Sequence, residues 1–337
     1  MTMSTSRPLT LLLSSEALRT WGDRIKAVGE DLSFLTSEEA LAADSPCEAD
    51  IAFMTREVTG KSSTNNPTPE LAGFDAVVRK APRLKWLQIH PAGAERPIYR
   101  ELRAHGVKVT TASGATAVTV SHSVLGALIA INRRFPLLAD AQRRHSWEPR
   151  LGERSPRDLK GQCAVIVGMG PIGRNIAGLL KGLGLRTIGV RRSADPVAEC
   201  DRTIAYGDLM AVLPEADWLI LCCPASAVTR GIANASVFAA MPKGSLFINV
   251  SRGEIAVEKD VIQALQSGHL AGAYLDVFER EPLDPASPLW DLPNVLISPH
   301  TASHSLGQNE AIFGIFLDNL ARFRDGKKLR NDVDDLG

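Results

Sequence analysis

The chain has 337 residues, with 38 Lys and Arg against 38 Asp and Glu, and 45% of its residues are hydrophobic. This length exceeds what one ordinary hydrophobic core serves and favours two domains. A chain without net charge has no overall field that attracts nucleic acid or an anionic membrane, so we expect a small-molecule ligand.

The apolar and cysteine patterns exclude several classes of protein. The run Val124–Ile131 is far below the roughly 18 residues that cross a bilayer, so no transmembrane helix is expected. Leu9–Leu13 is too short for a secretory signal, which favours a cytoplasmic protein. The five cysteines form no C-x-x-C pair, and His300 with His304 has metal-ligand spacing but follows a proline. Neither a disulfide framework nor a metal site is expected.

The first third of the chain alternates short apolar runs with helical patterns, which predicts a small parallel α/β unit. The expected strands are Leu9–Leu13, Ile51–Met54, Leu84–Ile89 and Val107–Val109. The polar stretch 61–70 predicts an exposed loop of unassigned role. From Val118 to about Arg144 a helical pattern predicts the hinge between two lobes, and Pro136 should kink or divide it.

The same alternation continues to the end of the chain and predicts a doubly wound sheet. Its expected strands are 164–167, Leu185–Val190, Trp218–Cys223, Leu246–Val250, Ala271–Asp276 and Val295–Ser298. A helix over Asn309–Phe323 should return to the first lobe. We therefore expect an α/β protein with a Rossmann-type doubly wound parallel sheet over 119–305. A smaller, flavodoxin-like substrate domain should comprise 1–118 and 306–337.

One glycine motif stands between an apolar strand and a helix start. Gly168, Gly170 and Gly173 fill the places of G-x-G-x-x-G directly after the run 164–167. In this motif the glycines permit a tight turn, close approach of amides to a pyrophosphate, and close helix–strand packing. Because the strand and helix context is present, the motif predicts a dinucleotide site that includes Pro171 and Ile172.

The end of the next strand distinguishes between the two nicotinamide dinucleotides. NAD-binding proteins usually carry an acid there for the ribose 2′-OH, whereas this chain has Arg191, Arg192 and Ser193. Guanidinium groups and a hydroxyl suit a 2′-phosphate, which favours NADP(H) and leaves NAD(H) possible. Asp195 lies slightly too far along for the acid's role. The alternative is an ordinary solvated basic loop.

Polar residues follow three of the expected strands. Arg252 comes after the run ending at 250, Asp276 and Glu281 after the run ending at 275, and His300 after the run ending at 298. In open α/β sheets ligands gather outside the carboxyl ends of the strands. A cation, two carboxylates and an imidazole are therefore expected on one cleft rim.

Four segments together resemble the D-isomer-specific 2-hydroxyacid dehydrogenases, a family that includes glyoxylate/hydroxypyruvate reductases. The segments are 168–173, Ile248–Glu254, Leu275–Leu283 and Pro288–His300, and the resemblance is close from about Leu84 to Leu317. The resemblance implies that Arg252 binds substrate, that Glu281 pairs with the catalytic histidine, and that His300 donates and accepts the proton. It also implies cofactor contacts from Cys223, Pro224, Thr229 and Val250, and from Asp276 at the nicotinamide carboxamide.

The residue types suit this chemistry by themselves. Reduction of a 2-keto acid needs a proton at the carbonyl oxygen as hydride reaches its carbon, and His300 is the candidate donor. A carboxylate such as Glu281 stabilises the imidazolium. Arg252 can bind a carboxylate or keto oxygen through charge-assisted hydrogen bonds. The alternative for each residue alone is a surface ion pair or a helix cap.

The first lobe and the hinge hold less certain candidates. Ala92 and Gly93 lie where relatives have a turn whose amides hold the substrate carboxylate, but the preceding Pro91 has no N–H to donate. Ser121-His-Ser123 stands where many relatives carry Ala-Glu-His, with its role open. Trp147 resembles a tryptophan that some hydroxypyruvate reductases place in their partner subunit's site; the alternative is simple packing.

The leading functional hypothesis is an NADPH-preferring reductase of a small 2-keto acid such as glyoxylate or hydroxypyruvate, acting as a homodimer. One alternative is an NAD-linked enzyme for a bulkier acid. Another is a non-catalytic dinucleotide sensor like the C-terminal-binding-protein corepressors, and a methyltransferase on a similar fold would leave Arg252, Glu281 and His300 unexplained.

Overall fold

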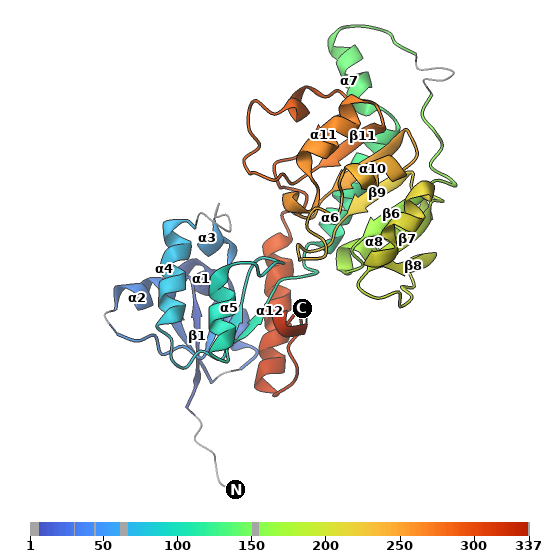
Figure 1. The fold of residues 1–337 in the computed structure, drawn as a ribbon. Coiled ribbons are helices and arrows are strands. Elements are labelled where there is room, and N and C mark those ends of the chain that lie inside the picture. The colour runs from blue at the N-terminus through green and yellow to red at the C-terminus, as the bar shows by residue number, and fades with distance from the viewer. Residues whose placement is uncertain (1–6, 30, 44, 61–66, 150–154, 336–337) are drawn as a thin grey trace. The chain divides into compact units, whose positions relative to one another are not determined.

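The computed structural model describes residues 7–29, 31–43, 45–60, 67–149 and 155–335 (Figure 1). Most of the predicted loop 61–70 therefore lies outside the described residues. The chain divides into two compact units. Met1–Ala115 with Leu306–Gly337 forms one, called here the N-terminal unit, and Thr116–Ser305 forms the central unit.

The N-terminal unit is built on a five-stranded parallel sheet with the order β2-β1-β3-β4-β5. This is the flavodoxin-like order, and each crossover passes through a helix. The strands are β1 (Leu9–Leu13), β2 (Leu32–Thr36), β3 (Ile51–Phe53), β4 (Trp86–Gln88) and β5 (Lys108–Thr110). The helices are α1 (Ser15–Lys26), α2 (Ser37–Ala42), α3 (Arg56–Thr59), α4 (Pro69–Arg79), α5 (Pro97–Ala104) and α12 (Gln308–Arg324).

Helix α12 joins this unit although it lies near the far end of the chain. Its Phe313 stacks on Trp21 of α1 with ring centroids 4.7 Å apart, and its Phe316 stacks on Phe53 of β3 at 4.2 Å. Both phenylalanines are fully buried. Burial of such aromatic surface is the main stabilising contribution that this helix can make, at about 1.5–3 kcal/mol for each ring.

The central unit is built on a seven-stranded parallel sheet with the order β12-β11-β10-β9-β6-β7-β8. This is a doubly wound order, whose direction reverses between β6 and β9. The strands are β6 (Cys163–Val167), β7 (Arg186–Arg191), β8 (Arg202–Ala205), β9 (Trp218–Leu221), β10 (Ser245–Asn249), β11 (Leu270–Leu275) and β12 (Val295–Ile297). Every residue of β6 and β9 is buried, as expected for central strands covered on both faces.

The described part of this unit has the α-helices α6 (Ala117–Asn132), α7 (Phe135–Arg143), α8 (Pro171–Gly182), α9 (Leu209–Val212), α10 (Ala235–Ala240) and α11 (Glu258–Gln266). The long helical pattern is divided just before Pro136, because Arg134 adopts a left-handed conformation with φ of 58°. Proline then occupies the first turn of α7, where its missing N–H costs nothing. No described helix is long and apolar enough to cross a membrane.

The expected Rossmann-type and flavodoxin-like sheets are both present, but two strands escaped prediction. These are β2 and β8, each at an edge of its sheet. Only the two end residues of β2 are buried, and β8 has one buried residue among four. An edge strand lacks the continuous apolar run that marks a central one, so its sequence pattern is weak.

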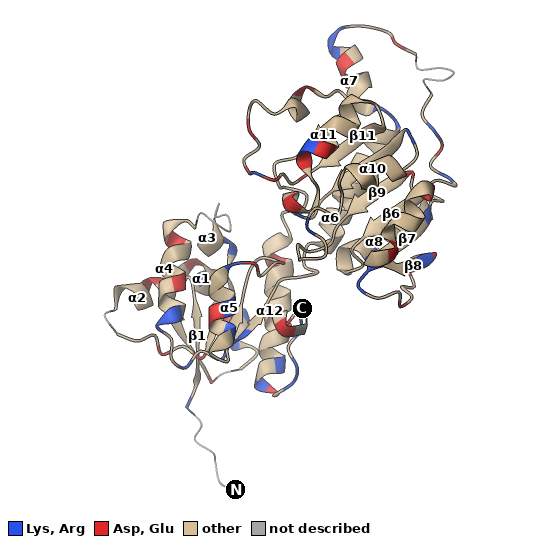
Figure 2. Cartoon of the chain, in the orientation of Figure 1, with Lys and Arg blue, Asp and Glu red and all other residues tan. Residues whose placement is uncertain are grey.

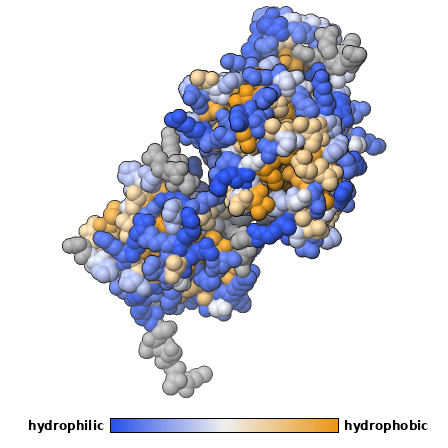
Figure 3. Space-filling model, in the orientation of Figure 1, coloured by the Kyte–Doolittle hydropathy of each residue, from blue (hydrophilic) through white to orange (hydrophobic). Residues whose placement is uncertain are grey.

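Charged residues of both signs are distributed along each unit (Figure 2). Figure 2 shows Lys and Arg interspersed with Asp and Glu, in keeping with the balanced composition. Hydrophilic residues predominate on the visible face, with apolar ones between them (Figure 3). Figure 2 shows no large field of one sign.

Candidate functional site

Three neighbouring strands of the central sheet carry the predicted polar residues at their carboxyl ends. Strands β10, β11 and β12 are adjacent and parallel, with Asn249 paired to Leu275 and Leu275 paired to Ile297. Arg252, Asp276 and His300 follow these three ends in turn. Parallel pairing in register is the reason that residues about 50 positions apart in sequence reach one edge.

His300 lies on a tight turn with unusual backbone geometry. Its φ is 55°, in the left-handed region that non-glycine residues adopt at a cost of order 1 kcal/mol or more. The amide of His300 donates to the carbonyl oxygen of Asp276 at 2.9 Å, which ties the turn to the end of β11. Such a strained conformation persists only where the surroundings enforce it.

His300 and Glu281 form the central pair of the site. The Nδ1 atom of His300 lies 2.8 Å from Oε2 of Glu281, and the two side chains are 47% and 37% exposed. Partial burial raises the pKa of Glu281. The opposite effect is larger and comes from the hydrogen bond and charge of His300, the amide of Phe278 and the charge of Arg252. The pKa therefore lies below the usual value. The ionised carboxylate fixes the ring and leaves Nε2 for a reacting group.

Arg252 is held beside this pair by close backbone packing. Its Nη1 donates to the carbonyl oxygen of Ser251 at 2.8 Å. The next residue, Gly253, approaches the loop after β11 so closely that a Cβ there would lie 1.9 Å from the carbonyl carbon of Phe278. Only glycine fits this contact, which brings the loop of Arg252 against the segment that leads to Glu281.

Asp276 is buried, with 3% of its surface exposed, and it binds the histidine turn directly. Its Oδ1 accepts hydrogen bonds from Ser298 Oγ at 2.5 Å, the Thr301 amide at 2.8 Å and the Ala302 amide at 3.0 Å. In the described part of the chain no group donates to Oδ2. One carboxylate oxygen therefore serves the turn, and the other is available to a ligand.

The predicted glycine turn forms between β6 and α8. Gly168 has φ of 108°, and a Cβ there would lie 2.6 Å from the Cys223 nitrogen. A Cβ on Gly173 would lie 1.9 Å from the carbonyl oxygen of Gly168. Gly170 caps α8 with open space beside it, and Pro171 and Ile172 begin the helix. The first amides of α8 thus have no side-chain cap and face room for an anion.

The other predicted cofactor residues line the same sheet edge. Cys223 is buried, Pro224 is exposed, and the Val250 amide donates to the Leu221 carbonyl at 3.1 Å. Thr229 is buried, and its hydroxyl donates to the Pro224 carbonyl at 2.7 Å. Thr229 therefore shapes the loop after β9, and its hydroxyl is already occupied.

Arg191 ends β7, and Arg192 and Ser193 follow it at the carboxyl edge. Arg191 is partly buried and Arg192 is exposed. Ser193 Oγ donates to Asp195 at 2.6 Å, so Asp195 shapes this loop. Both guanidinium groups follow the strand next to the glycine turn, since β6 and β7 are paired. This is the position where dinucleotide-binding sheets meet the adenosine ribose.

In the N-terminal unit, Ala92 and Gly93 follow β4 at the carboxyl edge of that unit's sheet. The Pro91 carbonyl accepts a hydrogen bond from Ala112 at 3.0 Å, which anchors the segment near β5. Among the described groups none accepts a hydrogen bond from the amide of Ala92 or Gly93. These two N–H groups can therefore receive an anionic oxygen, as predicted for a substrate carboxylate.

Comparison with known proteins identifies the family. The family model for the NAD-binding domain of D-isomer specific 2-hydroxyacid dehydrogenases matches residues 125–302. The chain belongs to this family. It is 32% identical to the glyoxylate/hydroxypyruvate reductase B of Escherichia fergusonii over 77% of this chain and 81% of the relative. The dehydrogenase is thus an NAD(P)-dependent oxidoreductase, as its sequence predicted.

Solved structures agree with this assignment. The dehydrogenase resembles a D-isomer specific 2-hydroxyacid dehydrogenase family protein of Aeromonas salmonicida, with a TM-score of 0.76, 30% identity, and coverage of 97% of this chain and 99% of that one. An NADPH-dependent glyoxylate/hydroxypyruvate reductase of Sinorhizobium meliloti, solved with NADP and sulfate, has a TM-score of 0.75 and 27% identity, with 97% and 99% coverage. The predicted two-sheet fold is confirmed.

Two side chains of this dehydrogenase's site, Ser298 and Tyr274, were not singled out from the sequence, and the role of a third, Ser123, was left open. Ser298 and Tyr274 form a hydrogen-bonded pair beside Asp276, and Ser123 of α6 binds the carbonyl of Ala302. The available signal was the phenol of Tyr274 within an otherwise apolar buried strand, because a buried hydroxyl requires a partner. Ser123 lies in the segment whose role the sequence left open.

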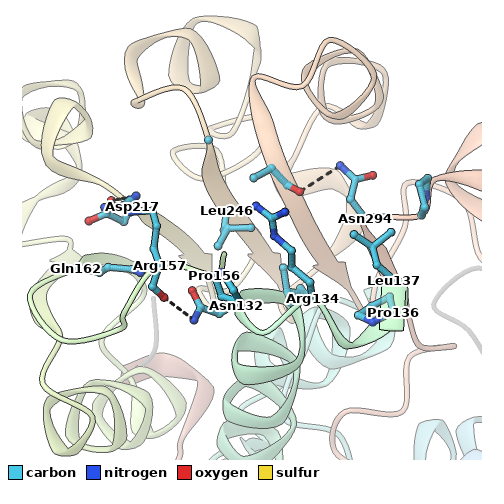
Figure 4. A pocket seen from close by; sticks show the side chains of 14 residues that line it. Asn132, Arg134, Pro136, Leu137, Pro156, Arg157, Gln162, Asp217, Leu246 and Asn294 are labelled. Atoms are coloured by element: carbon cyan, nitrogen blue, oxygen red, sulfur yellow. Dashed lines mark hydrogen bonds and ion pairs between the residues drawn. The ribbon is translucent and has the colours of Figure 1, made fainter. Parts of the chain in front are cut away.

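A cavity of about 270 Å³ in this dehydrogenase lies away from the site, at the opposite edge of the central sheet (Figure 4). Its lining includes Gln162, Asp217 and Gly244, which precede β6, β9 and β10. Asn132 donates to the Arg157 carbonyl at 3.0 Å, and Arg157 pairs with Asp217 at 2.7 Å. Asn132, Arg157 and Asp217 are therefore partnered within the lining. No described His, Cys, Asp and Glu side chains form a group that could hold a metal ion.

Proposed function

We propose that this dehydrogenase reduces a small 2-keto acid, such as glyoxylate or hydroxypyruvate, to the D-2-hydroxy acid with a preference for NADPH. The observation that carries the proposal is the 2.8 Å pair of His300 and Glu281 on the edge that also presents Arg252 and the glycine turn. The E. fergusonii and S. meliloti relatives, named as glyoxylate/hydroxypyruvate reductases, support the substrate class.

In this proposal each polar residue has one task. Arg252 binds the carboxylate or keto oxygen of the substrate and polarises the carbonyl. His300 delivers a proton from Nε2 to the keto oxygen, and Glu281 stabilises the imidazolium through Nδ1. Ala92 and Gly93 offer amides to the substrate carboxylate. In the reverse direction His300 accepts the hydroxyl proton, so the same pair serves both directions.

The residues present fit a nicotinamide dinucleotide. The open space beside Gly170 and the uncapped amides of α8 suit a pyrophosphate, and Oδ2 of Asp276 can accept from a carboxamide. When bound, the nicotinamide supplies the hydride. Arg191 and Arg192 are placed to bind a 2′-phosphate, which an acid at this position would repel. The presence of two arginines at this position supports a preference for NADPH over NADH.

Initial rates of NADPH and NADH oxidation with glyoxylate, hydroxypyruvate, pyruvate and phenylpyruvate test the proposal. We expect turnover with the small acids and faster turnover with NADPH, and chiral chromatography should identify the D product. Preference for phenylpyruvate and NADH would replace the proposal by an NAD-linked enzyme for bulkier acids. Tight NADPH binding without turnover of any acid would instead favour a dinucleotide sensor.

A further inference from the structure

The turn at 298–302 carries His300 and is attached to its neighbours on both sides of the histidine. Oδ1 of Asp276 accepts from Ser298 before the histidine and from Thr301 and Ala302 after it. A single oxygen atom of a buried carboxylate thus accepts hydrogen bonds from both flanks of the turn. Displacement of this atom would move both flanks together.

The hydrogen bonds around Ser298 have a determined direction. Its hydroxyl carries one proton, and a carboxylate can only accept, so Ser298 donates to Asp276. The hydroxyl of Tyr274, 2.8 Å from Ser298 Oγ, must therefore be the donor in that contact. Burial raises the pKa of Tyr274 and the charge of Asp276 adds to this effect, against the lowering by the hydrogen bond to Ser298, so the donor stays protonated. The chain runs from Tyr274 through Ser298 to Asp276.

A second attachment comes from α6. Ser123 Oγ donates to the Ala302 carbonyl at 2.9 Å, while the Ala302 amide donates to Asp276. Both polar groups of the Ala302 peptide backbone are thereby held by side chains of other elements. This contact gives a structural role to Ser123, and it restrains the turn on the flank that follows the histidine.

These attachments explain how the left-handed conformation of His300 persists. We propose that Ser298 and Tyr274, acting through the Asp276 carboxylate, are positioning residues that hold the His300 turn and keep the imidazole against Glu281. The inference rests on the proposed function of His300 as proton donor. Neither Ser298 nor Tyr274 needs to touch substrate, because a small displacement of the imidazole is enough to slow proton transfer.

Kinetics of four variants test the inference. Ser298→Ala and Tyr274→Phe should lower kcat about tenfold while the KM for NADPH stays within about twofold, since the imidazole is displaced but the dinucleotide contacts remain. Ser298→Thr keeps the hydroxyl and should retain most of kcat. The matched control is Ser245→Ala, a buried serine at the opposite end of β10.

Hydrogen exchange provides a readout that does not require turnover. The Thr301 and Ala302 amides should exchange faster in Ser298→Ala than in the wild type, and Ser245→Ala should leave their exchange unchanged. If the wild type reduces no 2-keto acid, the proposed function fails and exchange alone decides whether the turn is held in this way.

Three results would overturn the inference. The first is unchanged exchange in Ser298→Ala. The second is wild-type kcat in Ser298→Ala and Tyr274→Phe despite faster exchange, which would separate the attachments from catalysis. The third is an equal loss of kcat in Ser245→Ala or Ser298→Thr, which would indicate general packing damage instead of a role for the hydroxyl.

Discussion

At His300 different neighbours set the backbone and the side chain. Asp276 binds the turn through its carbonyl and carboxylate oxygens, whereas Glu281 binds the ring. This division matters because a general acid must be precisely placed and also kept in the correct protonation state. In the proposed role of His300 as general acid, separate carboxylates meet these two requirements, and their replacement should have separable effects.

Replacement of His300 by Ala should lower kcat for 2-keto acid reduction by roughly 10²- to 10⁴-fold, the usual contribution of a general acid. Dissociation constants for NADPH, measured by fluorescence titration, should change little. His304→Ala is the matched control, because this exposed histidine lies on the same segment. Turnover by His300→Ala at the wild-type rate would remove the residue from the mechanism.

The lowered pKa of Glu281 has a consequence for stability. A carboxyl whose pKa is lower in the folded state stabilises that state above its unfolded pKa, about 4.3, and loses this effect as pH falls through the folded value. We expect the Tm difference between wild type and Glu281→Gln to persist from pH 6 to about pH 5 and to shrink below about pH 4.3. A Tm difference that grows on acidification would have the wrong sign.

At the scale of elements, each candidate loop for the dinucleotide follows a strand of the central sheet, and its position depends on the strand order. The switch point between β6 and β9 places the glycine turn beside the Cys223 loop, and the next strand, β7, brings Arg191 and Arg192 to the same edge. We therefore expect cofactor preference to depend on the residues that end β7.

The double variant Arg191→Ala/Arg192→Ala should raise the KM for NADPH about 10- to 100-fold. This is the loss of affinity expected when one or two charge-assisted hydrogen bonds are removed. The KM for NADH should stay nearly unchanged, because NADH has no 2′-phosphate. Arg202→Ala, at the start of β8, serves as the control cation. Equal losses with both dinucleotides would show that the two arginines do not distinguish them.

At the scale of the whole molecule, each unit has its own parallel sheet and core, and the chain leaves the N-terminal unit at 115 and returns at 306. The central unit exposes large apolar side chains on and after α7: Phe135 at 52%, Leu138 at 42% and Trp147 at 95%. The exposure of Trp147 rules out packing within its own chain as its role. Large exposed apolar residues are typical of interaction surfaces.

We propose that α7 and the segment after it form the interface of a homodimer. Light scattering should give twice the mass of the chain, and Phe135→Glu/Leu138→Glu should give the mass of one chain, because charged residues would be buried without partners. Met210→Glu, at another exposed apolar position, is the control. A wild-type protein that is monomeric at micromolar concentration would contradict the proposal.

Much of the fold was predictable because its signals are local. Central strands such as β6 and β9 are continuous apolar runs, and the glycine turn has a fixed spacing, so both were located from the sequence. The end of α6 was harder to predict from the sequence. Pro136 predicted a division of the helical pattern, but the left-handed residue that performs it is Arg134, which has no distinctive sequence signal.

The sequence by itself determined the two sheets, the dinucleotide turn and the residue types of the candidate site, because periodicity, glycine spacing and polar strand ends are properties of short segments. Only the tertiary structure decided which of these residues meet. The 2.8 Å pair of His300 and Glu281, the close approach at Gly253 and the attachment of Ser298 to Asp276 depend on adjacent strands ending at one edge. Such contacts form between segments that are distant in sequence, so no local sequence pattern predicts them.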